Sequence, residues 1–194
     1  MFRHLQFDEL LAAMPRLQRI DLLVAGGADQ DNFLPRYKSL QRARAAQLWG
    51  ASAIGTSFHD RATARMAICS DLLDIAFIRY NPGHPGAETD LFPFIAPDRK
   101  CLAYNFKSVS SYVPEDVFRK LELPPSYKHP TVTDSYRFAL RRPEMDGILA
   151  APHIPQHVTD LVRALEAKPI SANKAEYMKN LWLLATGQAT IDRV

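Results

Sequence analysis

The sequence predicts an α/β fold in which about five parallel strands alternate with helices, within a single domain over residues 1–194. Three observations lead to this prediction. Short aliphatic runs recur along the chain and end in Gly, Asn or Pro; segments with helical spacing lie between them; and 194 residues are enough for one hydrophobic core. Such alternation favours parallel strands that are joined by right-handed crossovers.

The predicted strands are continuously apolar rather than alternating. RIDLLVAGG, at the start of the series, shows the pattern that a strand buried on both faces needs. We expect the strands at 19–27, 52–57, 73–80, 100–106 and 146–151.

The helices are predicted from apolar spacing and from residues that start or stop helices. Asp60 is a suitable N-cap, the segment that starts at Asp134 ends before Pro143, and Gly50 closes the segment ahead of the second strand. The proline-rich segment 108–132 is expected to be a long loop, of the kind that often forms lids. The helices are expected at 7–17, 37–50, 60–72, 134–143, 155–167 and from about 171, with the centre of the last at 174–184.

The composition excludes several classes of function. The formal net charge is only +3 and the charges are spread along the chain, which gives little reason to expect nucleic-acid binding. No apolar run approaches 18 residues and the N-terminus lacks a signal-peptide pattern, so we expect no membrane span and a cytoplasmic location. Two cysteines, Cys69 and Cys101, are too few for a disulfide framework or a zinc site.

Polar side chains follow several of the predicted strands. Ligands of parallel α/β folds bind at the carboxyl ends of the strands, so a small polar ligand is expected there. A cation directly after a buried strand, such as Lys107, would face such a pocket. The histidines show no metal-ligand spacing, so no metal is expected, and no catalytic residue is assigned. The candidate binding residues are Ser57, His59, Arg79, Tyr80, Asn81, Tyr104 and Lys107.

Each candidate also has a purely structural interpretation. Ser57 and Asp60 could cap the helix that follows them. Asn81 precedes Pro-Gly and forms turns readily, while Tyr80 and Tyr104 could pack at the rim with their hydroxyls in water.

The order of motifs along the chain resembles that of the aldo/keto reductases. The segments are RIDLLVAGG, IGTSFHDR, LLDIAFIRYNPGHPGAETDLFP, CLAYNFKS, TDSYRFALRRPEMDGIL and PQHVTDLVRALEAKPISANKAEYMKNL. The strongest matches are Tyr80, Asn81, His84, Gly86, Ala87 and Glu88, followed by Phe92 and Pro93. The resemblance covers essentially the whole chain but only the C-terminal part of that family's (β/α)8 barrel. It therefore implies a partial TIM-type barrel without the first three strands, since a whole barrel normally takes about 250 residues.

The resemblance also bears on the reductase chemistry. The family's catalytic Tyr, Lys and Asp belong to the early strands, and its active-site His corresponds to Gly26, so none of the four is carried over. The resemblance makes NADP the candidate cofactor, with Ser57 at the nicotinamide carboxamide and Tyr104 stacked on the ring. Phe58 and Phe77 stand where the family usually has Asn and Gln. The basic and Asn residues with which the family usually binds the adenosine phosphate correspond to positions near His153 and Leu161.

These observations predict a truncated, reductase-like protein that is non-catalytic or depends on a partner. An exposed edge strand tends to seek pairing, so we expect a homo-oligomer or a partner protein that supplies or covers the missing strands. Two alternatives stay open. One is an NADP-dependent oxidoreductase completed by a separate N-terminal half. The other is an enzyme of altered acid/base chemistry that uses the polar rim of His59, Arg79, His84, Tyr104 and Lys107.

Overall fold

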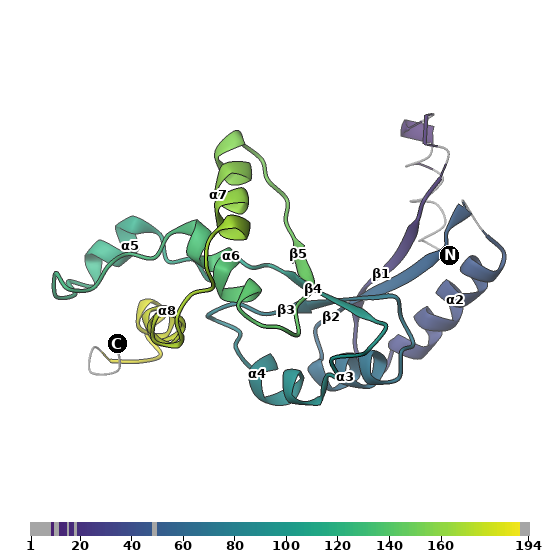
Figure 1. The fold of residues 1–194 in the computed structure, drawn as a ribbon, viewed down its shortest axis with the longest axis horizontal. Helices are drawn as coiled ribbons and strands as arrows, with labels where there is room; N and C mark the ends of the chain where they lie inside the picture. The colour runs from purple at the N-terminus through teal and green to yellow at the C-terminus, as the bar shows by residue number, and fades with distance from the viewer. Residues whose placement is uncertain (1–8, 10–11, 15, 18, 48–49, 191–194) are drawn as a thin grey trace.

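The computed structural model describes residues 9, 12–14, 16–17, 19–47 and 50–190, and its centre is a five-stranded sheet (Figure 1). The strands lie in the order β1-β2-β3-β4-β5, and every adjacent pair is parallel. The prediction of about five parallel strands that alternate with helices is confirmed. The strands are β1 (Leu22–Ala28), β2 (Ala53–Phe58), β3 (Ile75–Arg79), β4 (Leu102–Phe106) and β5 (Gly147–Leu149).

The helices follow the predicted order, with shifted ends that have local causes. The first described helix after β1 starts before residue 37, because Pro35 is tolerated in the first turn and Phe33 is buried against Phe58. The helix predicted to start at Asp134 starts two residues earlier, because Thr131 is its N-cap and Asp134 completes a capping box. The helices are α2 (Phe33–Ala45), α3 (Arg61–Cys69), α4 (Ala87–Asp90), the 3-10 turn η2 (Phe92–Phe94), α5 (Glu115–Lys120), α6 (Val132–Leu140), α7 (Pro155–Glu166) and α8 (Ala172–Ala185).

Segment 108–132 was expected to be a long loop, and segment 7–17 was expected to be a short helix. The proline-rich segment 108–132 is not a continuous loop, because it contains α5, which starts directly after Pro114. Most of the short helix expected at 7–17 lies outside the described residues. No helix in the described part of the chain is long and apolar enough to cross a membrane.

One face of the sheet packs on helices and holds the core. Ile54, Ala76, Ile78 and Ala103 point to this face and are almost fully buried among residues of α3 and α6. Burial of this apolar surface is the main force that holds the helices on the sheet.

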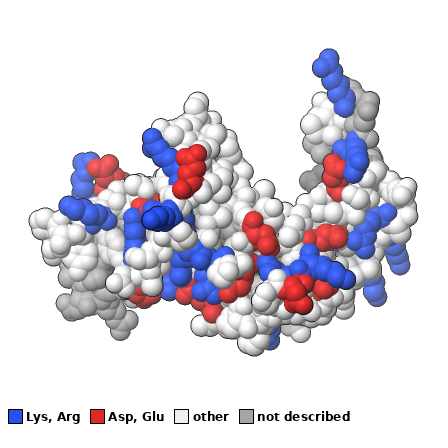
Figure 2. Space-filling model, viewed as in Figure 1, with Lys and Arg blue, Asp and Glu red and all other residues white. Residues whose placement is uncertain are grey.

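The opposite face is the one that faces the interior in a TIM-type barrel, and its side chains form layers across the sheet. Paired residues of neighbouring parallel strands share a face, so the register identifies the members of each layer. The layers are Val24–Gly55–Ile75–Leu102, then Ser57–Phe77–Tyr104–Gly147, then Arg79–Phe106–Leu149. Within the described residues the sheet does not close, and β1 and β5 are its two edges (Figure 1). Figure 2 shows a hollow between the β1 end and the β5–α7 end of the molecule.

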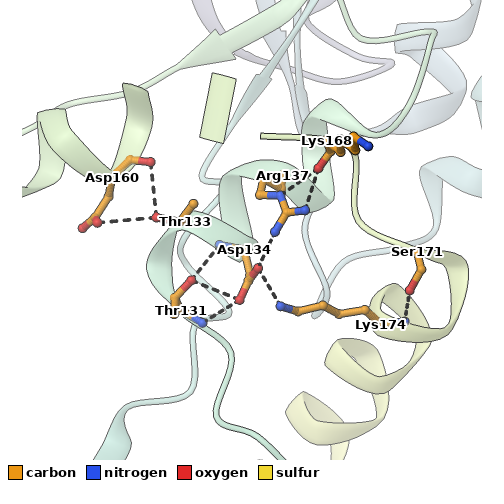
Figure 3. A network of polar contacts seen from close by, with 8 residues as sticks. All are labelled: Thr131, Thr133, Asp134, Arg137, Asp160, Lys168, Ser171 and Lys174. Atoms are coloured by element: carbon orange, nitrogen blue, oxygen red, sulfur yellow. Dashed lines mark hydrogen bonds and ion pairs between the residues drawn. The ribbon is translucent and has the colours of Figure 1, made fainter. Parts of the chain in front are cut away.

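Polar contacts tie the last helices to α6 (Figure 3). Asp134 accepts a hydrogen bond from Lys174 Nζ at 2.7 Å, which connects α6 to α8. Arg137 donates two hydrogen bonds to the carbonyl oxygen of Lys168, between α7 and α8. These contacts fix the C-terminal helices against the core.

On the face drawn in Figure 2 the basic and acidic residues are interspersed.

Candidate functional site at the strand ends

The carboxyl ends of β1 and β2 are joined by side chains. The Ser57 hydroxyl accepts a hydrogen bond from the Gly27 amide at 2.8 Å, and Arg36 on α2 donates to the carbonyls of Gly26 and Gly27. Ser57 therefore does not cap α3. Asp60 does, because its carboxylate accepts from the backbone amides of Ala62 and Thr63. Ser57 belongs to the barrel-interior layers, the face on which the resemblance implies a nicotinamide.

Tyr80 lies in the core and not at the rim. Its ring is fully buried and packs edge-on against Phe92, with ring centroids 5.0 Å apart. Its hydroxyl donates to Glu88 and accepts a hydrogen bond from Arg141 at 3.0 Å. Burial, reinforced by the Glu88 hydrogen bond, raises the pKa of the Tyr80 hydroxyl. The structure thus separates Tyr80 from the other predicted binding residues.

Asn81 is also fully buried, and it organises the loops that follow β3 and β4. Its amide nitrogen donates to the Lys107 carbonyl at 2.9 Å and to the Ser110 hydroxyl at 3.0 Å. Lys107 has a left-handed backbone with φ of 59°, which this anchored carbonyl helps to hold. Asn81 thus positions Lys107, whose own side chain is exposed.

His84 is fixed by the same amide. Its Nδ1 lies 3.2 Å from Asn81 Oδ1, and Asn81 uses its NH2 group elsewhere, so His84 Nδ1 is assigned as the donor. The Nε2 atom then remains for a ligand. Burial lowers the pKa of His84, and the positive charges of Arg79, Arg61 and Lys107 lower it further.

A small cavity lies where β2, β3 and the start of α3 meet. Its volume is about 70 Å³, and its polar lining consists of His59, Arg61, Arg79 and His84. Phe58, Ala64 and Ile78 line the remainder. The sheet register and the turn after β3 thus bring together His59 and Arg79 from the predicted set. Arg61 was not predicted; the only signal for it in the sequence is its place directly after His59 and Asp60.

Tyr104 stands apart from this cavity, in the middle interior layer. Its ring lies edge-on to Phe77, with centroids 6.3 Å apart, and over Gly147 on β5. A Cβ at Gly147 would lie 2.6 Å from the Tyr104 ring, so only glycine leaves room for the ring there. Tyr104 is thus held in the barrel interior, on the same face as Ser57.

The described residues contain no group of three His, Cys, Asp or Glu side chains that could hold a metal ion. The polar groups that do converge are cations and imidazoles, which suit an anionic or hydrogen-bonding ligand.

Comparison with solved structures places the fold among the aldo-keto reductases. An aldo-keto reductase of Bacillus halodurans, AKR11C1 in its holo form, superposes with a TM-score of 0.63 at 16% identity, over 84% of this chain and 59% of that one. The glycerol dehydrogenase AKR11B4 of Gluconobacter oxydans gives 0.60 at 14%, over 98% and 66%. An aldo/keto reductase of Klebsiella pneumoniae, solved with NADP and acetate, gives 0.57 at 12%, over 85% and 59%.

These similarities establish the fold class. The described chain has the fold of part of an aldo-keto reductase barrel, a partial TIM-type fold, and it spans about two thirds or less of the length of these structures. No protein-family model matches the sequence, and no curated protein matches it significantly. The resemblance seen in the motifs is thus confirmed at the level of fold.

Proposed function

We propose that this chain is a partner-dependent, reductase-like subunit without redox activity of its own, and that a partner polypeptide supplies the strands that close its barrel. The observation that carries the proposal is the exposure of apolar residues on the face of the sheet that would line a barrel interior. Val24, Leu102 and Leu149 belong to interior layers, yet they are 43%, 41% and 55% exposed. In a closed barrel the remaining strands would cover such residues.

The flank of the molecule beside β5 supports the same proposal. Helix α7 and its N-cap residue carry an apolar stripe of exposed side chains: Ile154, Val158, Val162 and Leu165. A stripe at this spacing normally packs on another element. Contiguous exposed apolar surface marks an interaction site, and unpaired strand edges such as those of β1 and β5 favour further pairing. A partner that adds strands between β1 and β5 and a helix beside α7 would cover all of these features.

The absence of independent redox activity is proposed from the resemblance. The family's catalytic Tyr, Lys and Asp have no counterpart in the motifs of this chain, and Gly26 stands at the position of the family His. The partner would then have to contribute any such chemistry.

Size-exclusion chromatography with light scattering tests the exposed interior directly. The chain purified alone should self-associate, and co-expression with a candidate partner should yield a defined complex. A monodisperse monomer that stays in solution at high concentration would overturn the proposal.

The second candidate function is an NADP-dependent oxidoreductase that is completed by the same partner. Ser57 and Tyr104 favour it, because both belong to the layer whose register runs Ser57–Phe77–Tyr104. The Klebsiella pneumoniae protein of similar fold was solved with NADP. Titration with NADPH, followed by its fluorescence, distinguishes the two functions. Tight binding by the chain alone contradicts the first, and no binding by the completed complex contradicts the second.

A further inference from the structure

The guanidinium of Arg79 has no partner in the described part of the chain. Arg79 is half-buried at the end of β3, and its Nε atom is buried without a hydrogen-bond acceptor. No ion pair or hydrogen bond involves any of its nitrogens within the described residues, whereas Arg141 and Arg99, which also have a buried Nε, bind carboxylates through their terminal nitrogens. A buried donor without an acceptor is costly, and a bound ligand would relieve that cost.

The polar groups around Arg79 are cations and imidazoles. His59, Arg61 and His84 line the same cavity, and the charge of Lys107 acts on His84 from the next loop. The cavity lining contains no carboxylate. The side chains of His59 and Lys107 form no hydrogen bond or ion pair with the described residues; each contacts the Phe106 ring instead.

The nearby acids are already engaged. Asp90 binds Arg61 at 2.6 Å, Asp60 caps α3, and Glu88 is held by Arg141 and Lys179. None of them neutralises Arg79. The protein therefore maintains a fixed positive site beside a cavity of about 70 Å³, several times the space that one bound water needs.

We propose that the cavity between Arg79, His84 and His59 binds the oxyanion group, carboxylate or phosphate, of a small-molecule ligand. Arg79 donates to two oxygens, as guanidinium groups do with planar or tetrahedral oxyanions. His84 Nε2 is left for the ligand because Asn81 holds Nδ1, and it donates to the anion when the imidazole is protonated. The charge of Lys107, which acts on His84 from the next loop, favours the anion as well. Every residue of the site lies on β2, α3, β3 or the loops after β2, β3 and β4, so the site is already formed without the strands that would complete the barrel.

Inorganic phosphate and acetate are the probes. Each is titrated into the full-length chain, in the assembly in which it purifies, with chloride holding the ionic strength constant. The readouts are the imidazole NMR signals of His84 and His59 and the pKa obtained from them. We expect saturable shifts and a higher pKa of His84 with anion bound, since the anion offsets the charges of Arg79, Arg61 and Lys107. The tighter of the two probes identifies the group as phosphate or carboxylate.

The variant Arg79→Gln should weaken binding about tenfold or more, which is the loss of one charge-assisted contact. Lys38→Gln removes the same charge from an exposed position on α2 and should leave binding unchanged. Circular dichroism verifies that the variants are folded. If Arg79→Gln does not fold, the anion affinities of Arg79→Lys and Lys107→Gln are measured instead, and each substitution should weaken binding severalfold. Shifts that do not saturate, or equal affinities in the Arg79 or Lys107 variants and in Lys38→Gln, would overturn the proposal.

Discussion

Lys179 Nζ lies 2.8 Å from Oε2 of Glu88, and through this contact α8 holds the turn that follows β3. The other carboxylate oxygen of Glu88 is shared by Tyr80 and Arg141. Three segments far apart in the sequence thus converge on one half-buried carboxylate. Although burial alone would raise the pKa of Glu88, hydrogen bonds from Lys179 and Tyr80 outweigh it, and the net shift is downward.

The variant Glu88→Gln should therefore be strongly destabilising. It leaves Arg141, which is 16% exposed, without its carboxylate, and leaves Lys179, which is 18% exposed, with the exposed Glu176 as its remaining acidic partner among the described residues. We expect the free energy of unfolding in urea to fall by about 2–4 kcal/mol, as when one partner of a buried ion pair is removed. The control Glu115→Gln breaks the Arg119 pair on α5, where both side chains are exposed, and should have little effect. Equal losses in the two variants would show that the Glu88 contacts add nothing.

The stability of the fold should decrease in acid. The pKa of Asp134 is lowered overall, because hydrogen bonds from Lys174 and the Thr131 backbone outweigh the effect of burial, and the pKa of Glu88 is lowered as well. A carboxyl with a lower pKa in the folded chain binds more protons when unfolded, so its contribution is present above its ordinary pKa and is lost as the pH falls through the folded value. Urea unfolding should show full stability at neutral pH and a loss that begins near about pH 4–5.

The variant Asp134→Asn isolates one part of this acid dependence. It should be less stable than the parent at pH 7, and the difference should shrink as the pH falls from the ordinary carboxyl pKa through the lower folded pKa of Asp134. A constant difference across the whole pH range would contradict the assignment of this linkage to Asp134.

Gly147 should be needed for the position of Tyr104. In Gly147→Ala the new Cβ would lie 2.6 Å from the Tyr104 ring, so either the ring or β5 must shift. We expect a loss of about 1–3 kcal/mol in the free energy of unfolding, as overpacking usually causes, and a changed near-UV circular dichroism signal. The control is Gly26→Ala, whose Cβ would meet only the Ser57 hydroxyl, at 3.7 Å. Unchanged stability and spectrum in Gly147→Ala would show that the site relaxes freely.

The sheet was predictable from the sequence, whereas much of the site was not. Continuous apolar runs identify strands buried on two faces, and Asp60 was recognisable as a cap from the residues beside it. Tyr80 was misplaced at the rim because a strand's polar residues can point to either face, and only the register shows that Tyr80 shares its face with Ile78 and the helices. The pair of Glu88 and Lys179 is separated by 91 residues, and no local pattern reports a contact of that kind.

For Arg61, the sequence offered only its place directly after His59 and Asp60 as a signal. Arg61 joins His59 and Arg79 because α3 starts just after β2 and packs against β3, which is a consequence of the fold and not of local spacing. Arg79, in contrast, was recognisable as a strand-end residue, since the carboxyl ends of parallel strands meet at one edge. It lines the cavity, and its role in binding stays a prediction.

The apolar stripe of α7 should govern assembly rather than the stability of the chain itself. Val158 and Leu165 are 48% and 64% exposed, so Val158→Lys with Leu165→Lys removes little buried surface and should leave the unfolding midpoint of the chain nearly unchanged. If the stripe packs against a partner or against other copies, the charged variant should reduce self-association and weaken complex formation, because each lysine would have to be desolvated in the interface. Light scattering after size-exclusion chromatography measures this effect. The matched control places the same two charges at Gln156 and Thr159, exposed neutral polar positions of the same helix, and should assemble like the parent. Loss of assembly in the control as well would attribute the effect to net charge and not to the stripe.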